Sequence, residues 1–317
     1  MKREVGVIMD PIGSIKIKKD STFAMMLAAQ RMGWRIWYME LDDLRLRGSL
    51  AEGRMREVRV TDRSDPWYRF GREDQRPLGA LDCILMRKDP PFDMEYVYTT
   101  YILEHAQEQG CLVVNDPRSL RDANEKVFTA RFGDCISPTL VTRSADDLVG
   151  FLDRHGDLIL KPLDGMGGAS IFRVRRADPN LHVIMETLTD HGRRFCMAQR
   201  FIPEIKQGDK RILVIDGEPI PYALARIPRE GETRGNLAAG GSGQGIALTD
   251  RDRWIVGRVG PELRARGILF AGLDVIGDYL TEINVTSPTC IRELDALYGL
   301  DIAGRLLESI GARLSDR

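Results

Sequence analysis

The chain has 317 residues, a formal net charge of −1 at pH 7 and 43% hydrophobic residues. This composition supports a buried core and excludes disorder as the global state, and the length is typical of two or three domains. The longest apolar run, at 23–29, is far shorter than the ~20 residues that span a bilayer. A net charge near zero gives no general attraction for nucleic acid. We expect no membrane segment, no signal peptide and a cytoplasmic location.

Five cysteines and four histidines are scattered through the chain. Their spacings match neither a disulfide framework nor a zinc site nor a histidine-based catalytic motif. Cys83 and Cys196 lie inside apolar stretches, so we expect their thiols to be buried as small hydrophobic groups. A reducing compartment fits this use of cysteine, and the partner of the protein is expected to be a small molecule.

The first third of the chain alternates short apolar runs with helical patterns. A strand over 4–9 is followed by a helix over 23–32, with Ser21 as its expected N-cap. Further strands are predicted at 35–40, 81–86 and 111–115, and a further helix at 94–109. Strands that alternate with helices indicate a parallel sheet.

A polar segment at 117–125 indicates a domain boundary and precedes a predicted helix that contains Lys126, Phe128 and Phe132. The next elements are strands at 139–142, 158–161, 171–174 and 195–199 and helices at 144–155 and 180–190. After them come a hairpin at 212–226, a helix at 249–266, strands at 268–276 and 279–284, and a closing helix to about 314.

These patterns predict an α/β domain followed by two α+β domains. The expected domains are a substrate-binding domain at 1–122, a lid at 123–200 and a catalytic domain at 201–317. Residues 231–245 contain six glycines in fifteen positions. A loop of this length usually covers an active site or is disordered, and we expect a mobile loop over 227–245.

Polar residues follow two of the strands predicted in the first domain. Asp10 comes after the first strand, and Arg87, Lys88 and Asp89 come after the strand at 81–86. Ligands collect at the carboxyl ends of parallel strands, so Asp10 and Arg87 are candidates for binding a substrate. The alternative is that these residues form ordinary turns and caps.

The loop at 161–170 joins two predicted strands and has the features of a phosphate site. Its backbone N–H groups at Gly165, Gly167 and Gly168 could surround an anion. Lys161, directly before the loop, could compensate phosphate charge, and Lys126 could be a second such cation. The loop matches neither the P-loop nor the dinucleotide fingerprint, and many glycine-rich turns only reverse the chain.

The hairpin at 273–284 offers oxygen ligands. Glu282 and Asn284 are two residues apart and face one side. Asp274 joins them only if it pairs with Glu282, which requires a three-residue connection or a bulge, and we predict such an irregularity. Two carboxylates and an amide suit Mg²⁺, which completes its shell with water and phosphate. The alternative is an exposed polar hairpin face.

Four arginines lie at predicted strand ends or beside the glycine-rich loop: Arg211, Arg226, Arg234 and Arg292. Their forked donors match carboxylate and phosphoryl oxygens. Together with the two lysines and the acidic hairpin, they indicate ATP-dependent chemistry in a cleft between domains. No kinase motif and no nucleophile of the protein's own is recognisable, so the substrate itself is expected to take the phosphoryl group.

At this point the sequence resembles bacterial glutathione synthetases of the ATP-grasp superfamily. The strings that carry the resemblance are GVIMDP at 6–11, IKKDS at 17–21, MRKDPPFD at 86–93, KPLDGMGGAS at 161–170, GDKR at 208–211, ARIP at 225–228, GETRGN at 231–236 and TEINVTSP at 281–288. The resemblance implies an ATP-grasp architecture with the nucleotide held between two α+β domains. It also implies a ligase that joins γ-glutamylcysteine to glycine with conversion of ATP to ADP and phosphate, usually as a homotetramer.

The resemblance also implies roles for single residues. Nucleotide contacts are expected from Lys126, Lys161, Gly165, Met166, Gly167, Gly168, Gln199, Ile202, Asp209 and Asn284. The metal, Mg²⁺ with Mn²⁺ as an alternative, is expected at Asp274, Glu282 and Asn284. Catalytic roles are assigned to Arg211, Arg226 and Arg234, and substrate contacts to Asp10, Arg87 and Arg292.

Two rival functions remain open on the sequence, and a protein that binds a free acidic product is a third, weaker idea. One is another carboxylate–amine ligase of the same superfamily, such as an enzyme that adds D-alanine or glutamate. The other is a regulatory module that binds ATP without turnover, against which the complete set of phosphoryl-transfer residues argues.

Overall fold

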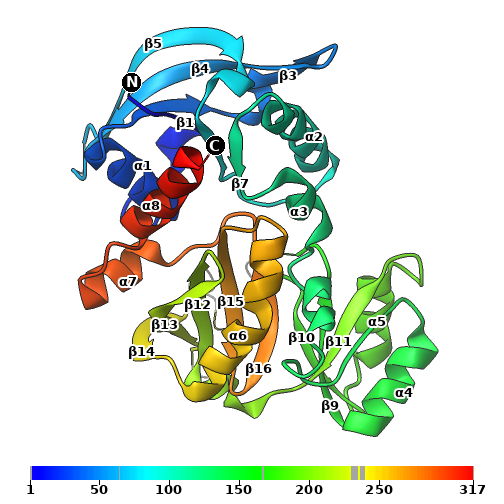
Figure 1. Ribbon diagram of the computed structural model, residues 1–317. Helices are drawn as coiled ribbons and strands as arrows, with labels where there is room; N and C mark the ends of the chain where they lie inside the picture. Colours follow the sequence, from blue (N-terminus) through cyan, green and yellow to red (C-terminus); the bar gives the residue numbers. More distant parts are fainter. Residues whose placement is uncertain (1, 64, 166–167, 230–234, 236–239, 317) are drawn as a thin grey trace.

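The computed structural model describes residues 2–316 apart from 64, 166–167, 230–234 and 236–239. The described strands form three sheets, of seven, four and five strands, which follow one another along the chain (Figure 1). Within these residues no helix is long and apolar enough to cross a membrane. All five cysteines are buried, as expected for Cys83 and Cys196.

The first sheet has the predicted parallel centre. Its parallel strands are β1 (Glu4–Ile8), β2 (Arg35–Met39), β6 (Cys83–Met86) and β7 (Leu112–Val114). The helices of this part are α1 (Ser21–Arg31), α2 (Met94–Glu108) and α3 (Pro117–Asp122). The expected cap of α1 is wrong by one residue. The Asp20 carboxylate accepts the hydrogen bond from the Phe23 N–H at 2.6 Å, and Ser21 is the first helical residue.

Three antiparallel strands extend this sheet in a region where the sequence reading placed no element. They are β3 (Leu44–Arg47), β4 (Leu50–Val60) and β5 (Tyr68–Pro77). Most residues of β5 are exposed or half-buried, so its charged side chains give no apolar alternation. Short 3₁₀ turns occur at Ile12–Ser14, Leu41–Asp43 and Leu78–Ala80.

The second sheet is antiparallel and has a core of its own. Its order is β10-β9-β11-β8, formed by β8 (Thr139–Thr142), β9 (Asp157–Pro162), β10 (Phe172–Arg175) and β11 (Cys196–Arg200). Helices α4 (Ala145–His155) and α5 (Leu181–Thr189) supply apolar side chains to the core. The helix expected around Lys126 is instead a 3₁₀ turn, Val127–Arg131, because the Asn124 side chain accepts from the N–H groups of Lys126 and Val127.

The third sheet carries the acidic hairpin. Its order is β14-β13-β12-β15-β16, formed by β12 (Asp209–Ile215), β13 (Glu218–Ile227), β14 (Ser242–Ala247), β15 (Phe270–Ile276) and β16 (Tyr279–Asn284). The 3₁₀ turn Pro203–Gln207 precedes β12, and helix α6 (Asp250–Ala265) connects β14 to β15. Buried residues of the first and third sheets belong to common apolar clusters, whereas the second sheet has a separate one.

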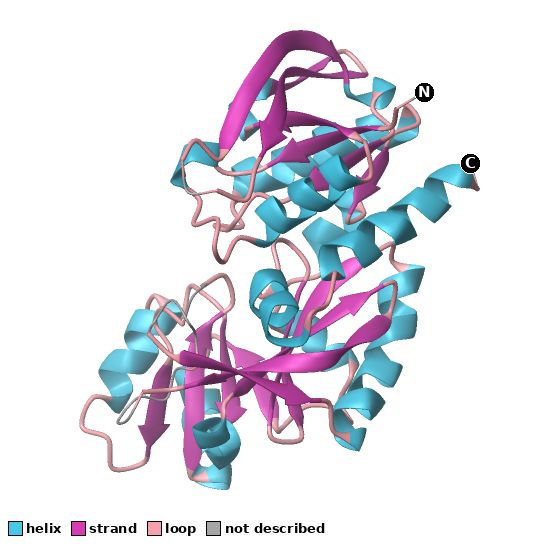
Figure 2. Ribbon diagram, turned by 90° about the vertical axis from the view of Figure 1, so that its left-hand side faces the viewer, coloured by secondary structure: helices cyan, strands magenta, loops and turns pink. Residues whose placement is uncertain are grey.

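The expected closing helix is two helices, α7 (Ile291–Tyr298) and α8 (Ile302–Ser315). Gly299 ends α7 in the left-handed conformation at φ 64°, which breaks the helical path. Helix α8 returns to the first sheet and lies beside α1 (Figures 1 and 2), where Arg31 and Asp301 form an ion pair at 2.7 Å. The chain ends also meet, with Arg3 donating to Ser315 at 2.9 Å. The domain limits at residues 122 and 200 stay a prediction.

Candidate active site

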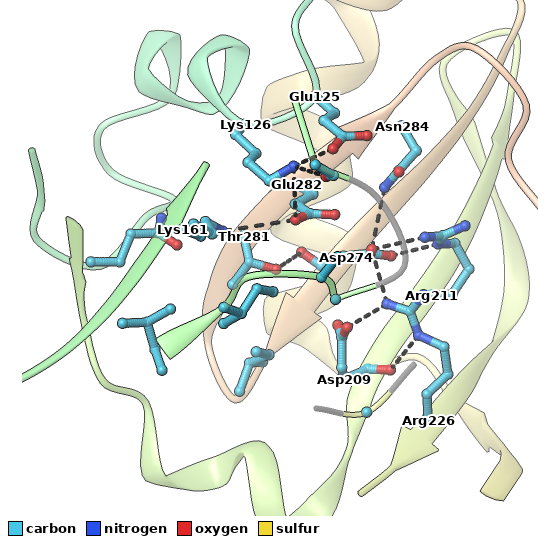
Figure 3. Close-up of a pocket in the computed structure, with 18 of the residues that line it drawn as sticks. Glu125, Lys126, Lys161, Asp209, Arg211, Arg226, Asp274, Thr281, Glu282 and Asn284 are labelled. Carbon is cyan, nitrogen blue, oxygen red and sulfur yellow. Dashed lines mark hydrogen bonds and ion pairs between the residues drawn. The ribbon is translucent and has the colours of Figure 1, made fainter. Parts of the chain in front are cut away.

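A cavity of about 310 Å³ lies between the second and third sheets. Its walls come from β9 and the loop after it, from β11, and from β12, β15 and β16, while Asp89 and Pro90 of the first domain close one end. Figure 3 shows polar side chains of the second and third sheets, and of the segment with Glu125 and Lys126, pointing toward one another in this space. The cavity is therefore the place where residues from the middle and the end of the chain meet.

The predicted irregularity in the acidic hairpin is confirmed. Gly277 and Asp278 form a two-residue turn, and Ile276 pairs with Tyr279. The register then shifts so that Asp274 pairs with Glu282, which leaves Thr281 as the extra residue of a bulge. The Thr281 hydroxyl donates to the Asp274 carbonyl oxygen at 3.1 Å. The bulge thus places Asp274 and Glu282 on the same side, as a shared site requires.

Asp274 is the centre of a buried ion-pair network. Its Oδ2 accepts from Arg211 Nη2 at 2.8 Å, from Arg226 Nη2 at 2.9 Å and from Asn284 Nδ2 at 3.2 Å. Burial alone would raise the pKa of Asp274, but the guanidinium groups of Arg211 and Arg226 outweigh it and hold the pKa at about 2. The carboxylate therefore stays ionised, and both predicted arginines are fixed beside it.

Asp209 is the second carboxylate of this network. One oxygen binds Arg226, whereas Oδ1 is buried without a hydrogen-bond partner among the described residues. Burial raises the pKa of Asp209 to about 7 in spite of the Arg226 charge. A buried acceptor that lacks a partner carries a desolvation cost, so Asp209 is suited to bind a donor group of a ligand in the cavity.

The two predicted lysines meet at Glu282. Lys126 Nζ and Lys161 Nζ each lie 3.8 Å from Glu282 Oε1, and Figure 3 shows both ammonium groups turned toward it. Lys126 also binds the Glu125 carboxylate and the Gly165 carbonyl oxygen, the latter at 2.7 Å. The expected convergence of amines and carboxylates in one cavity is thus present.

The environments of the two lysines differ. Burial lowers the pKa of Lys161, and the attraction of Glu282 opposes this only in part. Burial acts in the same direction on Lys126, but Glu282 and Glu125 outweigh it and raise the pKa. The positive charge of Lys161 is therefore less well compensated than that of Lys126. An anionic ligand would supply the missing negative charge.

The predicted nucleotide residues lie along this cavity where they are described. Gly165, Gly168, Gln199 and Ile202 line it, and the apolar side chains of Ile159, Phe201 and Ile276 line it with them. The Gln199 amide donates to the Thr139 hydroxyl at 3.1 Å. Met166, Gly167 and Arg234 lie outside the described residues, as do nine of the nineteen residues of the predicted mobile loop at 227–245. At the end of that loop, residues 242–245 are instead part of β14, which pairs with β13.

The three predicted substrate residues lie outside the lining of this cavity in the described structure. Asp10 binds Lys88 at 2.8 Å. Arg87 is buried and donates to the Pro288 carbonyl oxygen at 3.0 Å. Arg292 forms an ion pair with Asp62 at 3.0 Å. Their substrate contacts stay a prediction.

Glu125 is a charged lining residue for which the sequence predicted no role. Glu125 is adjacent to Lys126, and this neighbour was the available signal. Burial and then the charge of Glu282 raise the pKa of Glu125. Arg200 donates to the Tyr279 hydroxyl at 3.1 Å and so ties β11 to β16. Cys290 adopts a φ of 87°, which no local pattern predicts.

The donor set of the hairpin fits a hard divalent cation. Asp274 and Glu282 supply carboxylates, and Asn284 supplies an amide group beside them. No group of three or more His, Cys, Asp or Glu that could hold a metal occurs among the described residues. A metal here would thus need other oxygen ligands, which matches Mg²⁺, bound by one or two carboxylates with water and phosphate.

Comparison with known proteins agrees with this geometry. A family model described as prokaryotic glutathione synthetase, ATP-grasp domain, matches residues 125–299, and the model of the N-terminal domain of that family matches residues 3–121. The glutathione synthetase of Pseudomonas aeruginosa is 59% identical over 317 residues and 100% of both chains. That of Vibrio cholerae is 60% identical over 311 residues and 98% of both chains.

Solved structures share the fold at low sequence identity. D-cycloserine synthetase has a TM-score of 0.67 and 14% identity, with 98% of this chain and 99% of that chain covered. An ATP-grasp ligase solved with a minimal precursor, Mg and ADP has a TM-score of 0.64 and 16% identity, with 98% of both chains covered. These neighbours show the ATP-grasp fold. Because the family models and the full-length relatives agree, the chain belongs to the prokaryotic glutathione synthetase family.

Proposed function

We propose that this chain makes glutathione by joining γ-glutamylcysteine to glycine, with conversion of ATP to ADP and phosphate. The observation that carries the proposal is the single cavity in which Lys126, Lys161 and the bulged hairpin converge. Support comes from relatives that carry the name glutathione synthetase and match the whole chain at 59% to 60% identity. The ligase class follows from the same family membership.

The first step activates the dipeptide. The cysteinyl carboxylate attacks the γ-phosphorus of ATP, and an acyl phosphate and ADP result. Two anions must approach each other, so the barrier falls when cations spread the charge of the transferring group. Lys126 and Lys161 stand 3.8 Å from one oxygen of Glu282 and face the cavity. We propose that these two ammonium groups bind the phosphates of ATP. Arg211 is proposed to compensate the negative charge of the transferring group together with them.

A divalent metal belongs to the same proposal. Asp274, Glu282 and Asn284 would hold Mg²⁺, and Mn²⁺ is an alternative for the same oxygen ligands. When bound, the metal supplies positive charge beside the phosphates. The role of the protein residues is to keep this corner anionic, since the pKa of Asp274 is held at about 2 by Arg211 and Arg226 against the effect of burial.

The second step forms the peptide bond. The amine of glycine attacks the acyl carbon, the bond to the phosphate oxygen breaks, and phosphate leaves. Arg226 is our choice to stabilise the tetrahedral oxyanion, because it is 6% exposed and fixed by Asp209 and Asp274. Water must be excluded meanwhile, and we assign this to closure of the loop at 231–245 together with Arg234.

A substrate panel tests the proposal. Phosphate release is measured with γ-glutamylcysteine and ATP in the presence of glycine, of D-alanine or of no amine. We expect rapid release and glutathione formation with glycine alone. Preference for D-alanine would favour another ligase of the superfamily, and ATP binding without any release would favour a regulatory module.

Two further features remain part of the proposal. The homotetramer is implied by the resemblance, and sedimentation equilibrium of the purified chain tests it. Replacement of residues 231–245 by a short linker tests the lid. We expect ATP binding to persist while ADP release without peptide formation rises, and unchanged coupling would contradict the role of the loop.

A further inference from the structure

The side chain of Asn115 links the first sheet to the third. Its Nδ2 donates to the Phe270 carbonyl oxygen at 2.8 Å and to the Val285 carbonyl oxygen at 2.7 Å, and its Oδ1 accepts from the Phe270 N–H at 2.9 Å. Asn115 is 4% exposed. Both amide donors and the amide oxygen are therefore used, and every partner is backbone of the third domain.

These partners belong to the hairpin that carries the acidic residues. Phe270 is the first residue of β15, on which Asp274 lies, and Val285 follows Asn284 at the end of β16. The Asn115 amide thus holds the open end of the hairpin, opposite the turn at Gly277. It does so from the end of β7, the edge of the first sheet where ligands of parallel sheets collect.

Neighbouring contacts tie the following segment to the same sheet. The Arg87 guanidinium donates to the Pro288 carbonyl oxygen at 3.0 Å, and the Ser287 hydroxyl donates to the Arg87 carbonyl oxygen at 3.3 Å. Residues Thr286, Ser287, Thr289 and Cys290 line the cavity. The floor of the cavity is therefore attached to the domain expected to bind the dipeptide.

Apolar packing does not fix this alignment by itself. The first and third sheets share apolar clusters, and such burial is non-directional, so it holds the sheets together while permitting small shifts. Hydrogen bonds weaken steeply when distance or angle changes. Three of them from one rigid amide specify the position of the hairpin relative to the strand ends of the first sheet.

We propose that Asn115 is a positioning residue that aligns the phosphoryl-transfer hairpin with the dipeptide site of the first domain. This inference rests on the proposed function. The nucleotide site lies between the second and third sheets, so loss of the amide should leave ATP binding in place. The cysteinyl carboxylate oxygen and the γ-phosphorus should be misaligned, which raises the KM for the dipeptide and uncouples ATP use from peptide formation.

The test is steady-state kinetics of Asn115→Ala in the full chain. We expect the KM for γ-glutamylcysteine to rise about tenfold, the KM for ATP to stay within about twofold, and ADP released per glutathione to exceed the wild-type ratio. KM and this ratio do not depend on how much of the enzyme is folded. Asn115→Ser, which keeps one hydrogen-bonding group, should give an intermediate result and serves if the alanine variant does not fold.

The matched control is Gln30→Ala. The Gln30 amide also bridges backbone, donating to the Val60 carbonyl oxygen at 2.9 Å and accepting from the Val60 N–H at 3.0 Å, but it joins α1 to β4 within the first domain. Gln30→Ala should lower the stability of the protein without changing either KM or the amount of ADP released per glutathione. If the Asn115 variants behave like this control, the positioning role is wrong. If the wild-type enzyme forms no glutathione, the proposed function fails instead.

Discussion

Lys161 tests how the cavity handles charge. Its side chain is 5% exposed, and the ion pair that the described residues give it is the 3.8 Å contact with Glu282. Burial lowers its pKa, because the contact with Glu282 compensates the charged form only in part. Lys161→Met keeps the length of the side chain and removes the ammonium group. We expect Lys161→Met to weaken ATP binding without lowering the stability of the protein.

The expected changes in ATP affinity and in stability can be estimated separately. A hydrogen bond to a charged group contributes about 1.5–3 kcal/mol, which corresponds to a rise in the Kd for ATP of about 10-fold to 150-fold. Removing one partner of a buried ion pair costs about 3–5 kcal/mol when the other charge stays buried and unpaired, but Glu282 is 22% exposed and keeps its contact with Lys126. The nucleotide-free variant should therefore be at least as stable as the wild-type protein.

Lys210 provides the matched control with the opposite expectation. Its Nζ binds the carboxylate of Asp252, which is 0% exposed, and donates to the Gly277 carbonyl oxygen at 3.0 Å. Lys210 lies outside the lining of the cavity. Lys210→Met leaves the Asp252 charge buried and unpaired, so we expect a loss of about 3–5 kcal/mol in the free energy of unfolding and unchanged ATP binding.

Titration calorimetry with ATP and urea unfolding without nucleotide measure the two quantities. The reasoning is refuted if Lys161→Met loses as much stability as Lys210→Met while it binds ATP as tightly as the wild-type protein. That outcome would show that Lys161 is a structural ion-pair partner of Glu282 and that its charge is not reserved for phosphate.

Three further changes test the network. Glu282→Gln should raise the Mg²⁺ concentration for half-maximal activity at least about tenfold, and an unchanged metal titration would exclude Glu282 as a ligand. Burial raises the pKa of Asp209 from 3.8 to about 7, so the neutral form is favoured in the folded state. The Tm of the wild-type protein relative to Asp209→Asn should therefore fall as the pH rises from about 4 to about 7, and a constant difference would contradict the shift. In Gly272→Ala the new Cβ would lie 2.8 Å from Arg211 Cδ and 3.1 Å from Pro288 Cβ, so we expect a lower kcat, and wild-type kinetics would show that Arg211 can move freely.

The acidic hairpin could be predicted from the sequence because its geometry is local. A period of two places Glu282 and Asn284 on one face, and the requirement that Asp274 join them specifies an irregular register. The structure has this register shift between Asp274 and Val275. Lys161 was identified from its position directly before a glycine-rich loop, and the role of Lys126 came from the resemblance to the family.

Other features could not be predicted because they depend on contacts that are distant in sequence. Arg292 binds Asp62, 230 residues away, and no local pattern indicates this partner. The β5 strand packs Tyr68 and Phe70 against an apolar cluster, but its other residues show no apolar alternation because, in the described sheet, it is an edge strand paired with β4 on one side. The Asn115 side chain binds Phe270 and Val285, which lie 155 and 170 positions away along the chain. In the sequence, an isolated asparagine after a strand indicates only an ordinary turn.

The charge of the cavity explains why a metal-bound nucleotide suits it. Among the described lining residues, five are cationic, namely Lys126, Lys161, Arg200, Arg211 and Arg226, and five are acidic, namely Asp89, Glu125, Asp209, Asp274 and Glu282. Each buried anion needs a compensating charge, so a free triphosphate would leave this balanced lining strongly negative, and a divalent cation removes much of that excess.

Asp209, with a pKa raised by burial to about 7, can give up its own negative charge near neutral pH. We therefore expect ATP binding to be accompanied by proton uptake at this carboxyl group, which calorimetry in buffers of different ionisation enthalpy measures. Loss of that uptake in Asp209→Asn would support the assignment, and equal uptake in both proteins would contradict it.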